Sequence, residues 1–108
     1  MTNKALESNH VLNLIRTTVR QQEPNARIIL YGSRARGDAR PDSDWDVLIL
    51  LDKPKMTADQ RGDITYNLWF KGMENNVDID AFAYTMNQWN DKPLSLYKVN
   101  VANEGIEL

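Results

Sequence analysis

Residues 28–51 of this chain read IILYGSRARGDARPDSDWDVLILL. The apolar runs at residues 28–31 and 47–51 each have the length and composition of a buried strand. Between them, residues 33–43 are polar and contain a glycine and a proline, which are typical of turns. This stretch therefore predicts two strands joined by a long turn, with Gly32 ending the first strand.

Helices are predicted on both sides of these strands. Apolar residues recur at helical spacing over residues 5–21, and Pro24 ends that helix because proline disfavours helix at the residue before it. Farther along, Thr57 and Gln60 have the spacing of a capping box, which opens a helix expected to reach Gly72.

The C-terminal part of the chain predicts one more strand and a last helix. Apolar and other residues alternate over residues 77–84, which is the period-two pattern of a strand. Thr85 and Gln88 repeat the capping-box spacing, and a final helix is expected over residues 93–105. This order favours one α/β (α+β) domain spanning residues 1–108, with a small mixed β-sheet flanked by helices. The pattern leaves the strand directions open.

The composition excludes several classes of protein. The chain has no cysteine, which rules out disulfides, thiolate zinc sites and cysteine nucleophiles. No apolar stretch approaches the length of a membrane span, and the first residues lack the apolar centre of a signal peptide. A cytoplasmic protein without a membrane partner is therefore expected. The net charge of −2 argues against nucleic acid as a partner, because proteins that bind it usually carry a basic excess.

Two aspartates stand at the start of the second predicted strand. Side chains two residues apart in a strand point to the same face, so Asp44 and Asp46 aim two carboxylates into one space. Aspartate is disfavoured in strands, and two like charges beside a buried strand repel each other. A hard divalent cation such as Mg²⁺, which takes oxygen ligands, would resolve that repulsion.

The turn before these aspartates offers groups that bind phosphate. Gly32 lets the backbone approach a ligand closely, and the turn's N–H groups with the Ser33 hydroxyl can cradle phosphate oxygens. Arg34 or Arg36 could add charge-assisted hydrogen bonds to the same group. A triphosphate lying between this turn and a metal ion would have its α-phosphorus polarised for in-line attack.

A third carboxylate would complete a two-metal site, and the later strand offers two candidates on one face, Asp78 and Asp80. Either could bind a metal ion and accept the proton of an acceptor. Asp80 is favoured because it lies farther inside the predicted strand, closer to Phe82 and Tyr84. Taken alone, each of these signals is compatible with an ordinary turn or a solvated charge. Their order along the chain is what points to one site.

The run from Tyr31 to Ile49 closely resembles the signature of the DNA polymerase β-type nucleotidyltransferase superfamily. That signature is an apolar residue with Gly-Ser, a spacer, and then Asp-apolar-Asp-apolar, the last of which is matched here by Asp44-Trp45-Asp46 and the following valine. The Ser-Arg-Ala-Arg-Gly version of the turn is similar to that of the minimal nucleotidyltransferase branch, and the length and order of the elements also fit that branch.

The resemblance implies a polymerase β-like fold in which Asp44 and Asp46 bind metal, the Gly-Ser turn contacts the triphosphate, and Asp78 or Asp80 supplies the third carboxylate. It further implies two Mg²⁺ ions and transfer of a nucleoside monophosphate, AMP from ATP in the first place, to an acceptor hydroxyl. Members of the branch often pair with a small helical HEPN-type protein in toxin–antitoxin systems. Some of them adenylylate a tyrosine of the toxin.

The sequence leads to three hypotheses of function: an enzyme acting on a partner protein, a binding module, and an enzyme that needs no protein partner. As an enzyme, the protein would be an adenylyltransferase acting on a partner protein, because a chain of 108 residues has no second lobe to enclose a small acceptor. As a binding module, it would be a non-catalytic antitoxin that neutralises its partner by masking. A third and weaker alternative is a small-molecule or nucleic-acid nucleotidyltransferase, which would need no protein partner.

Other residues are assigned to structure rather than to chemistry. Trp45 is expected to be a core ring beside the site, and His10, the only histidine, is expected on the surface. The helix that opens at Thr57 is expected to bury Ile64 and Leu68, and Trp69 is expected either in the core or on a surface that faces a partner.

Overall fold

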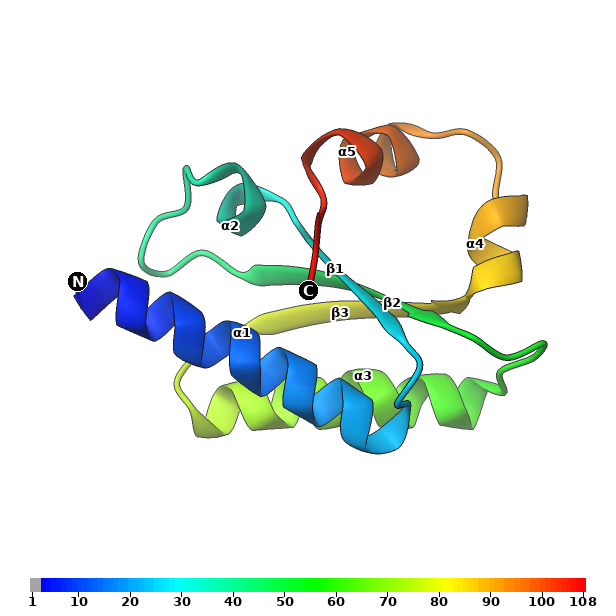
Figure 1. Ribbon diagram of the computed structural model, residues 1–108, viewed down its shortest axis with the longest axis horizontal. Coiled ribbons are helices and arrows are strands. Elements are labelled where there is room, and N and C mark those ends of the chain that lie inside the picture. Colours follow the sequence, from blue (N-terminus) through cyan, green and yellow to red (C-terminus); the bar gives the residue numbers. More distant parts are fainter. Residues whose placement is uncertain (1–2) are drawn as a thin grey trace.

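A computed structural model describes residues 3–108 of the chain, with side chains from residue 8 onward (Figure 1). Leu6, which belongs to the apolar stripe predicted over residues 5–21, has its side chain outside the described residues. The elements follow one another as α1 (Asn3–Gln22), β1 (Arg27–Tyr31), α2 (Ser33–Arg36), β2 (Trp45–Leu51), α3 (Ala58–Glu74), β3 (Ile79–Thr85), α4 (Met86–Asp91), α5 (Leu96–Glu104) and β4 (Ile106–Glu107).

The strands form one four-stranded mixed sheet in the order β3-β2-β1-β4. Strand β1 is antiparallel to both β2 and β4, whereas β2 and β3 are parallel. The parallel pair needs a long crossover, which α3 provides. The predicted mixed sheet is thus confirmed. The short strand β4 and the single-turn helix α2 are additions that the sequence pattern did not indicate.

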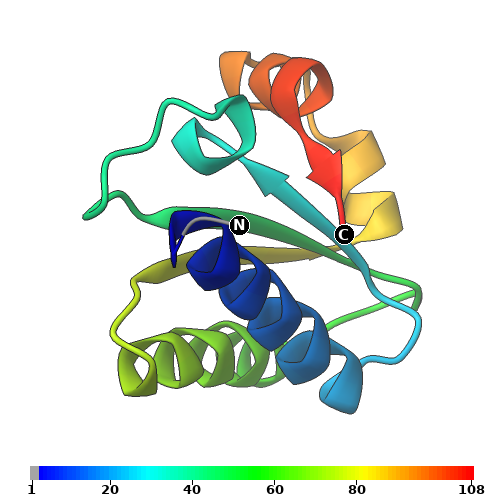
Figure 2. The same ribbon diagram turned by 60° about the vertical axis from the view of Figure 1, so that its left-hand side comes forward.

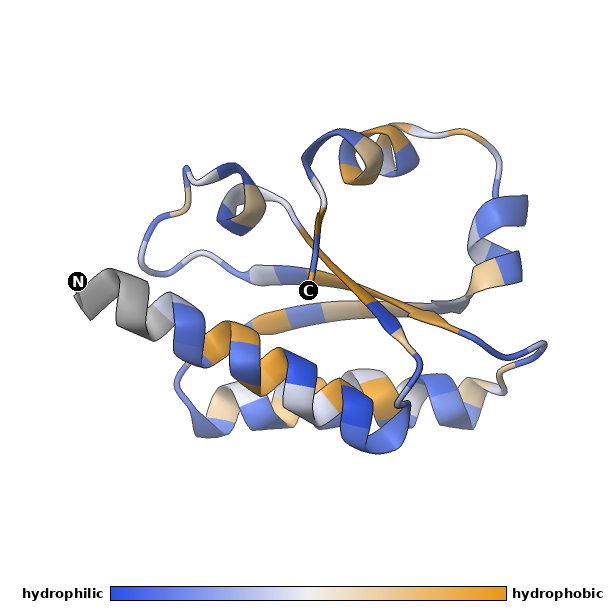
Figure 3. Cartoon of the chain, viewed as in Figure 1, coloured by the Kyte–Doolittle hydropathy of each residue, from blue (hydrophilic) through white to orange (hydrophobic). Residues whose placement is uncertain are grey.

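The sheet separates two groups of helices. Helices α1 and α3 cover one face, and α2, α4 and α5 lie on the other side (Figures 1 and 2). Colouring by hydropathy shows β1 and β2 as the most apolar part of the fold, between helices that mix apolar and polar residues (Figure 3). The protein's main core therefore lies between the sheet and the pair α1–α3. None of the helices within residues 3–108 combines the length and the apolarity needed to span a membrane.

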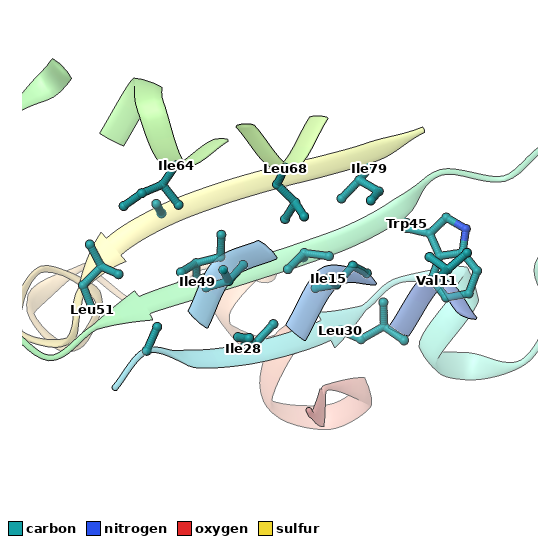
Figure 4. Close-up of a cluster of buried hydrophobic side chains, with 14 of the residues drawn as sticks. Val11, Ile15, Ile28, Leu30, Trp45, Ile49, Leu51, Ile64, Leu68 and Ile79 are labelled. Carbon is teal, nitrogen blue, oxygen red and sulfur yellow. The ribbon is translucent and has the colours of Figure 1, made fainter. Parts of the chain in front are cut away.

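Strand β2 serves both faces of the sheet because successive side chains alternate. Its odd-numbered residues point toward α1 and α3 and join a core of fully buried aliphatic side chains, among them Ile15, Ile28, Ile49 and Leu68 (Figure 4). Its even-numbered residues face α5 and form a second, smaller cluster of buried side chains with β1 and α5: Tyr31, Leu48, Leu50 and Val101. Asp46 has the same parity as this second cluster and so lies at the end of the α5 face.

The helix starts follow the sequence closely. Thr57 and Gln60 form the predicted capping box of α3, and Thr85 and Gln88 form that of α4. In the last helix, Gly105 is the C-cap but keeps an extended backbone with φ −64°. Its glycine is needed for another reason, since a Cβ there would lie 2.8 Å from the side chain of Ile29 on β1.

Of the two places predicted for Trp69, the structure excludes the core, because its side chain is 42% exposed. The buried face of α3 consists of Ile64, Leu68 and Gly72, which are four residues apart and therefore form one stripe. Position 69 is one residue farther along the helix and points outward from that stripe. Ile64 and Leu68 are buried as predicted, and Figure 4 shows both reaching into the core.

Candidate active site

Four aspartates lie at the same end of the parallel pair β2–β3. The register pairs Asp46 with Asp80, so these two residues are direct neighbours on adjacent strands. Asp44 and Asp78 precede them by two residues on each strand, and the N–H of Trp45 donates to the carbonyl of Asp78 at 2.8 Å. Asp46 is half-buried, whereas the other three are exposed. The fold therefore brings together all the carboxylates that the sequence singled out.

The pKa values of Asp46 and Asp78 are raised at this end of the sheet. The pKa of Asp46 is raised by its burial and then by the negative charges of Asp80, Asp44 and Glu104, with Arg36 opposing them. The pKa of Asp78 is raised by burial, by the charge of Asp44 and by a hydrogen bond with that side chain. Each shift reflects first the cost of burying a charge and then the cost of holding like charges close together. The site thus carries an excess of negative charge.

Gly32 lies directly against this group. It follows β1 with φ 76° and ψ −160°, a backbone conformation essentially restricted to glycine. Its carbonyl accepts hydrogen bonds from the N–H groups of Ala35 and Arg36, each at 3.0 Å, which starts α2. A Cβ at position 32 would collide with the carboxylate of Asp46. The glycine is therefore required by the contact between the turn and the aspartate, as well as by the turn itself.

The two arginines of the turn have different surroundings. Arg34 folds back on its own loop, where Nη2 donates to the carbonyls of Ser43 at 3.0 Å and Pro41 at 3.2 Å. Its guanidinium also lies 4.5 Å from the ring centre of Trp45, which is only 4% exposed and confirms the prediction of a core ring. Arg36 is turned toward α5 and the site. Of the two, Arg36 is the one whose charge reaches Asp46.

Sequence reasoning missed Glu104, the last residue of α5. Its Oε1 accepts the N–H of Gly32 at 2.9 Å, and its Oε2 accepts Nη1 of Arg36 at 3.0 Å. A single glutamate near the end of a helix, far along the chain from the turn, carries no pattern that points to this contact. The residue enters the site because β4 pairs with β1 and so draws the end of α5 beside the turn.

The donor set fits a hard divalent cation. In the part of the chain that the structure describes, no three Asp, Glu or His side chains converge as a metal site in their present rotamers. The group nevertheless consists of carboxylate oxygens, which Mg²⁺ prefers, and the neighbouring charges that raise the pKa of Asp46 are those a cation would neutralise. A cavity of about 540 Å³ lies elsewhere, between α5 and the β1 side of the sheet, and none of the four aspartates lines it.

The arrangement defines an α/β domain with a glycine turn and paired carboxylates at the end of one sheet. Residues 12–107 match the sequence profile of the nucleotidyltransferase domain, so the chain belongs to the nucleotidyltransferase domain family. The family resemblance seen in the sequence is thereby confirmed. No curated protein sequence matches this chain.

Solved structures share the fold at low sequence identity. A toxin–antitoxin crystal structure with AMP-PNP aligns with a TM-score of 0.64 and 20% identity, over 88% of this chain and 69% of its own. A variant of the toxin–antitoxin pair MntA–HpeT aligns with a TM-score of 0.62 and 21% identity, over 89% and 69%. A putative nucleotidyltransferase from Sulfolobus solfataricus aligns with a TM-score of 0.63 and 17% identity, over 99% and 86%. These likenesses show that the chain shares the fold of these proteins, a mixed sheet flanked by helices.

Proposed function

We propose that this protein transfers AMP from ATP to a hydroxyl group of a partner protein in a Mg²⁺-dependent reaction. The observation that carries the proposal is the register of β2 and β3, which sets Asp46 beside Asp80 and against the Gly32 turn. Carboxylates next to a backbone that can approach phosphate are the two halves of a nucleotidyl-transfer site. Membership of the nucleotidyltransferase family supports the same reaction class.

Each residue of the site has a separate role in the proposed reaction. Asp44 and Asp46 would hold Mg²⁺, which supplies a positive charge that neutralises the phosphates and polarises the α-phosphorus. The turn at Gly32 and Ser33 and the guanidinium of Arg36 would orient the triphosphate. Asp80 would take the proton of the acceptor hydroxyl while the acceptor oxygen bonds to the α-phosphorus and the bond to the pyrophosphate oxygen breaks.

A protein acceptor suits this site better than a small one. Asp44, Asp78 and Asp80 are exposed, so the described fold leaves the carboxylate group open to a large partner. Two of the structural neighbours are toxin–antitoxin complexes. We therefore propose a small helical HEPN-type protein as the partner and one of its tyrosines as the acceptor.

A second candidate function is neutralisation of that partner by masking, without catalysis. It is favoured by the occupation of Gly32 and Arg36 by Glu104, which leaves these two donors engaged within the protein. The two functions differ in their dependence on Asp44 and Asp46, since masking needs a surface but no metal.

The test is transfer of label from α-³²P-ATP with Mg²⁺ to the protein encoded beside this one in the genome. We expect a labelled partner band that is lost in the Asp44→Asn/Asp46→Asn variant, with the modified residue identified by mass spectrometry. Neutralisation of the partner should be scored in parallel. If the double variant neutralises as well as the wild type and no label is transferred by either, the masking function replaces this one.

A further inference from the structure

The carboxylate of Glu104 is held in the turn by two strong contacts. One oxygen accepts the backbone N–H of Gly32 at 2.9 Å, and the other accepts the guanidinium of Arg36 at 3.0 Å. The glutamate side chain is 18% exposed and that of Arg36 is 47% exposed, so the carboxylate is partly enclosed while the guanidinium stays open to solvent. Charge-assisted hydrogen bonds of this kind are stronger than neutral ones.

The same two donors are those that the proposed function assigns to the triphosphate. A phosphate oxygen and a carboxylate oxygen accept hydrogen bonds from the same groups, and each donor here is already engaged. The charge of Glu104 also acts on Asp46, so the carboxylate adds to the negative charge of the site. A triphosphate bound next to it would meet a repelling charge within a few ångströms. Glu104 and the triphosphate therefore compete for one place.

We propose that Glu104 is an internal stand-in for phosphate, which occupies the phosphate-binding turn in the nucleotide-free protein and is displaced when a nucleoside triphosphate binds. This inference rests on the proposed function, because it takes the turn at Gly32 to be the place of the triphosphate. Its consequence is autoinhibition: the free energy of the Glu104 contacts is subtracted from the binding of the nucleotide.

The packing of α5 allows such a displacement. Val101 is the one buried residue of this helix, while Leu96 and the preceding Leu94 are 76% and 83% exposed. The backbone after Glu104 is fixed more firmly, because Gly105 packs closely against Ile29 and β4 pairs with β1. We therefore expect the Glu104 side chain to leave the turn by rotation about its own bonds, while the backbone after it stays in place.

The test compares Glu104→Gln with wild type and with Glu107→Gln. Glutamine keeps the shape of the side chain and removes its charge. Glu107 is a matched control on the same C-terminal segment, since its carboxylate pairs with Arg27 away from the turn. Affinity is measured by calorimetry with two probes, inorganic tripolyphosphate and the Mg²⁺ complex of α,β-methylene-ATP. We expect Glu104→Gln to bind both about tenfold more tightly, as for the loss of one competing charged hydrogen bond. Glu107→Gln should bind as the wild type does.

A second measurement keeps the inference testable if Glu104→Gln proves unstable. In the wild-type protein, the ¹⁵N–¹H resonance of Gly32 and the side-chain resonances of Glu104 should shift together as tripolyphosphate is added. Equal or weaker binding by a folded Glu104→Gln, or a Glu104 signal that does not move at saturation, would overturn the inference and leave the proposed function standing. If wild type and variant both fail to bind either probe, the proposed function fails and the inference falls with it.

Discussion

Asp46 of β2 and Asp80 of β3 are direct neighbours in register on two parallel strands, at one end of the sheet. Directly opposed like charges destabilise a strand pair, and the pKa of Asp46 is raised first by burial and then by the charge of Asp80. Asp80 is the aspartate of β3 nearest to Asp46 by register, whereas Asp78 lies before the strand and beside Asp44. A pair of this kind lowers the stability of the fold, which is typical of residues kept for function.

Removing one member of the pair should therefore stabilise the metal-free protein. We expect Asp46→Asn to raise the free energy of unfolding by about 0.5–1 kcal/mol, which corresponds to an increase in Tm of about 2–4 °C for a domain of this size. Thermal unfolding followed by circular dichroism in EDTA measures the effect. The control is Asp52→Asn, an exposed aspartate just past the other end of β2, which should leave Tm unchanged. A lower Tm for Asp46→Asn would mean that the aspartate is held by stabilising contacts instead.

The choice between Asp78 and Asp80 as third carboxylate can be decided by activity. Because Asp80 pairs with Asp46 in register, we expect Asp80→Asn to slow label transfer by about 10²–10⁴-fold, as for loss of a general base. Asp78→Asn should slow label transfer far less. Single-turnover transfer from labelled ATP separates the two, with circular dichroism to show that both variants are folded. The reverse order of the two losses would assign the third carboxylate to Asp78.

Much of this fold could be predicted from local patterns. The two apolar runs, the capping boxes at Thr57 and Thr85 and the alternation in β3 are all signals carried within a few residues. The motif from Tyr31 to Ile49 likewise named the turn and the first two aspartates, because a strand, a glycine and spaced carboxylates are contiguous in the chain. The short strand β4 was not predicted because two residues are too few to show an alternating pattern.

The relationships that complete the site could not be predicted, because they depend on pairing between distant segments. Strand direction decides whether Asp80 lies beside Asp46, and alternation along one strand does not reveal its direction. Glu104 reaches Gly32 only through the pairing of β4 with β1. Arg34 and Arg36 have different surroundings because one lies beside Trp45 and the other beside α5. The sequence of the turn gives no information about the positions of Trp45 and α5.

Two glycines in α3 should respond in opposite ways to the same substitution. Gly62 has no atom within 4 Å of a Cβ placed on it, so Gly62→Ala should stabilise the protein by about 0.5–1 kcal/mol through the higher helix propensity of alanine. At Gly72, a Cβ would lie 2.9 Å from the Ile79 side chain and 2.9 Å from the carbonyl oxygen of Val77. Gly72→Ala should therefore destabilise by about 1–3 kcal/mol, as overpacking does. Urea unfolding of both variants gives the comparison, and a gain in stability for Gly72→Ala would contradict the close contact of α3 with β3.

The glycine of the turn should be the most sensitive in the chain to alanine, for two reasons that can be separated. Gly32 combines a positive φ with a near-extended ψ, and its Cβ would collide with the carboxylate of Asp46. We expect Gly32→Ala to destabilise the protein by about 3 kcal/mol and to abolish nucleotide binding.

Gly37 is the control. It also has a positive φ, of 87°, but lies in the left-handed helical region with open space around its Cβ position. Gly37→Ala should lower the free energy of unfolding by only about 1 kcal/mol and leave the affinity for α,β-methylene-ATP unchanged. Asp46→Ala removes the collision but not the backbone strain, so in chemical unfolding it should stabilise the Gly32→Ala protein more than it stabilises the wild type. If the gain is the same in both backgrounds, the strained backbone alone accounts for the glycine, and the contact with Asp46 is incidental.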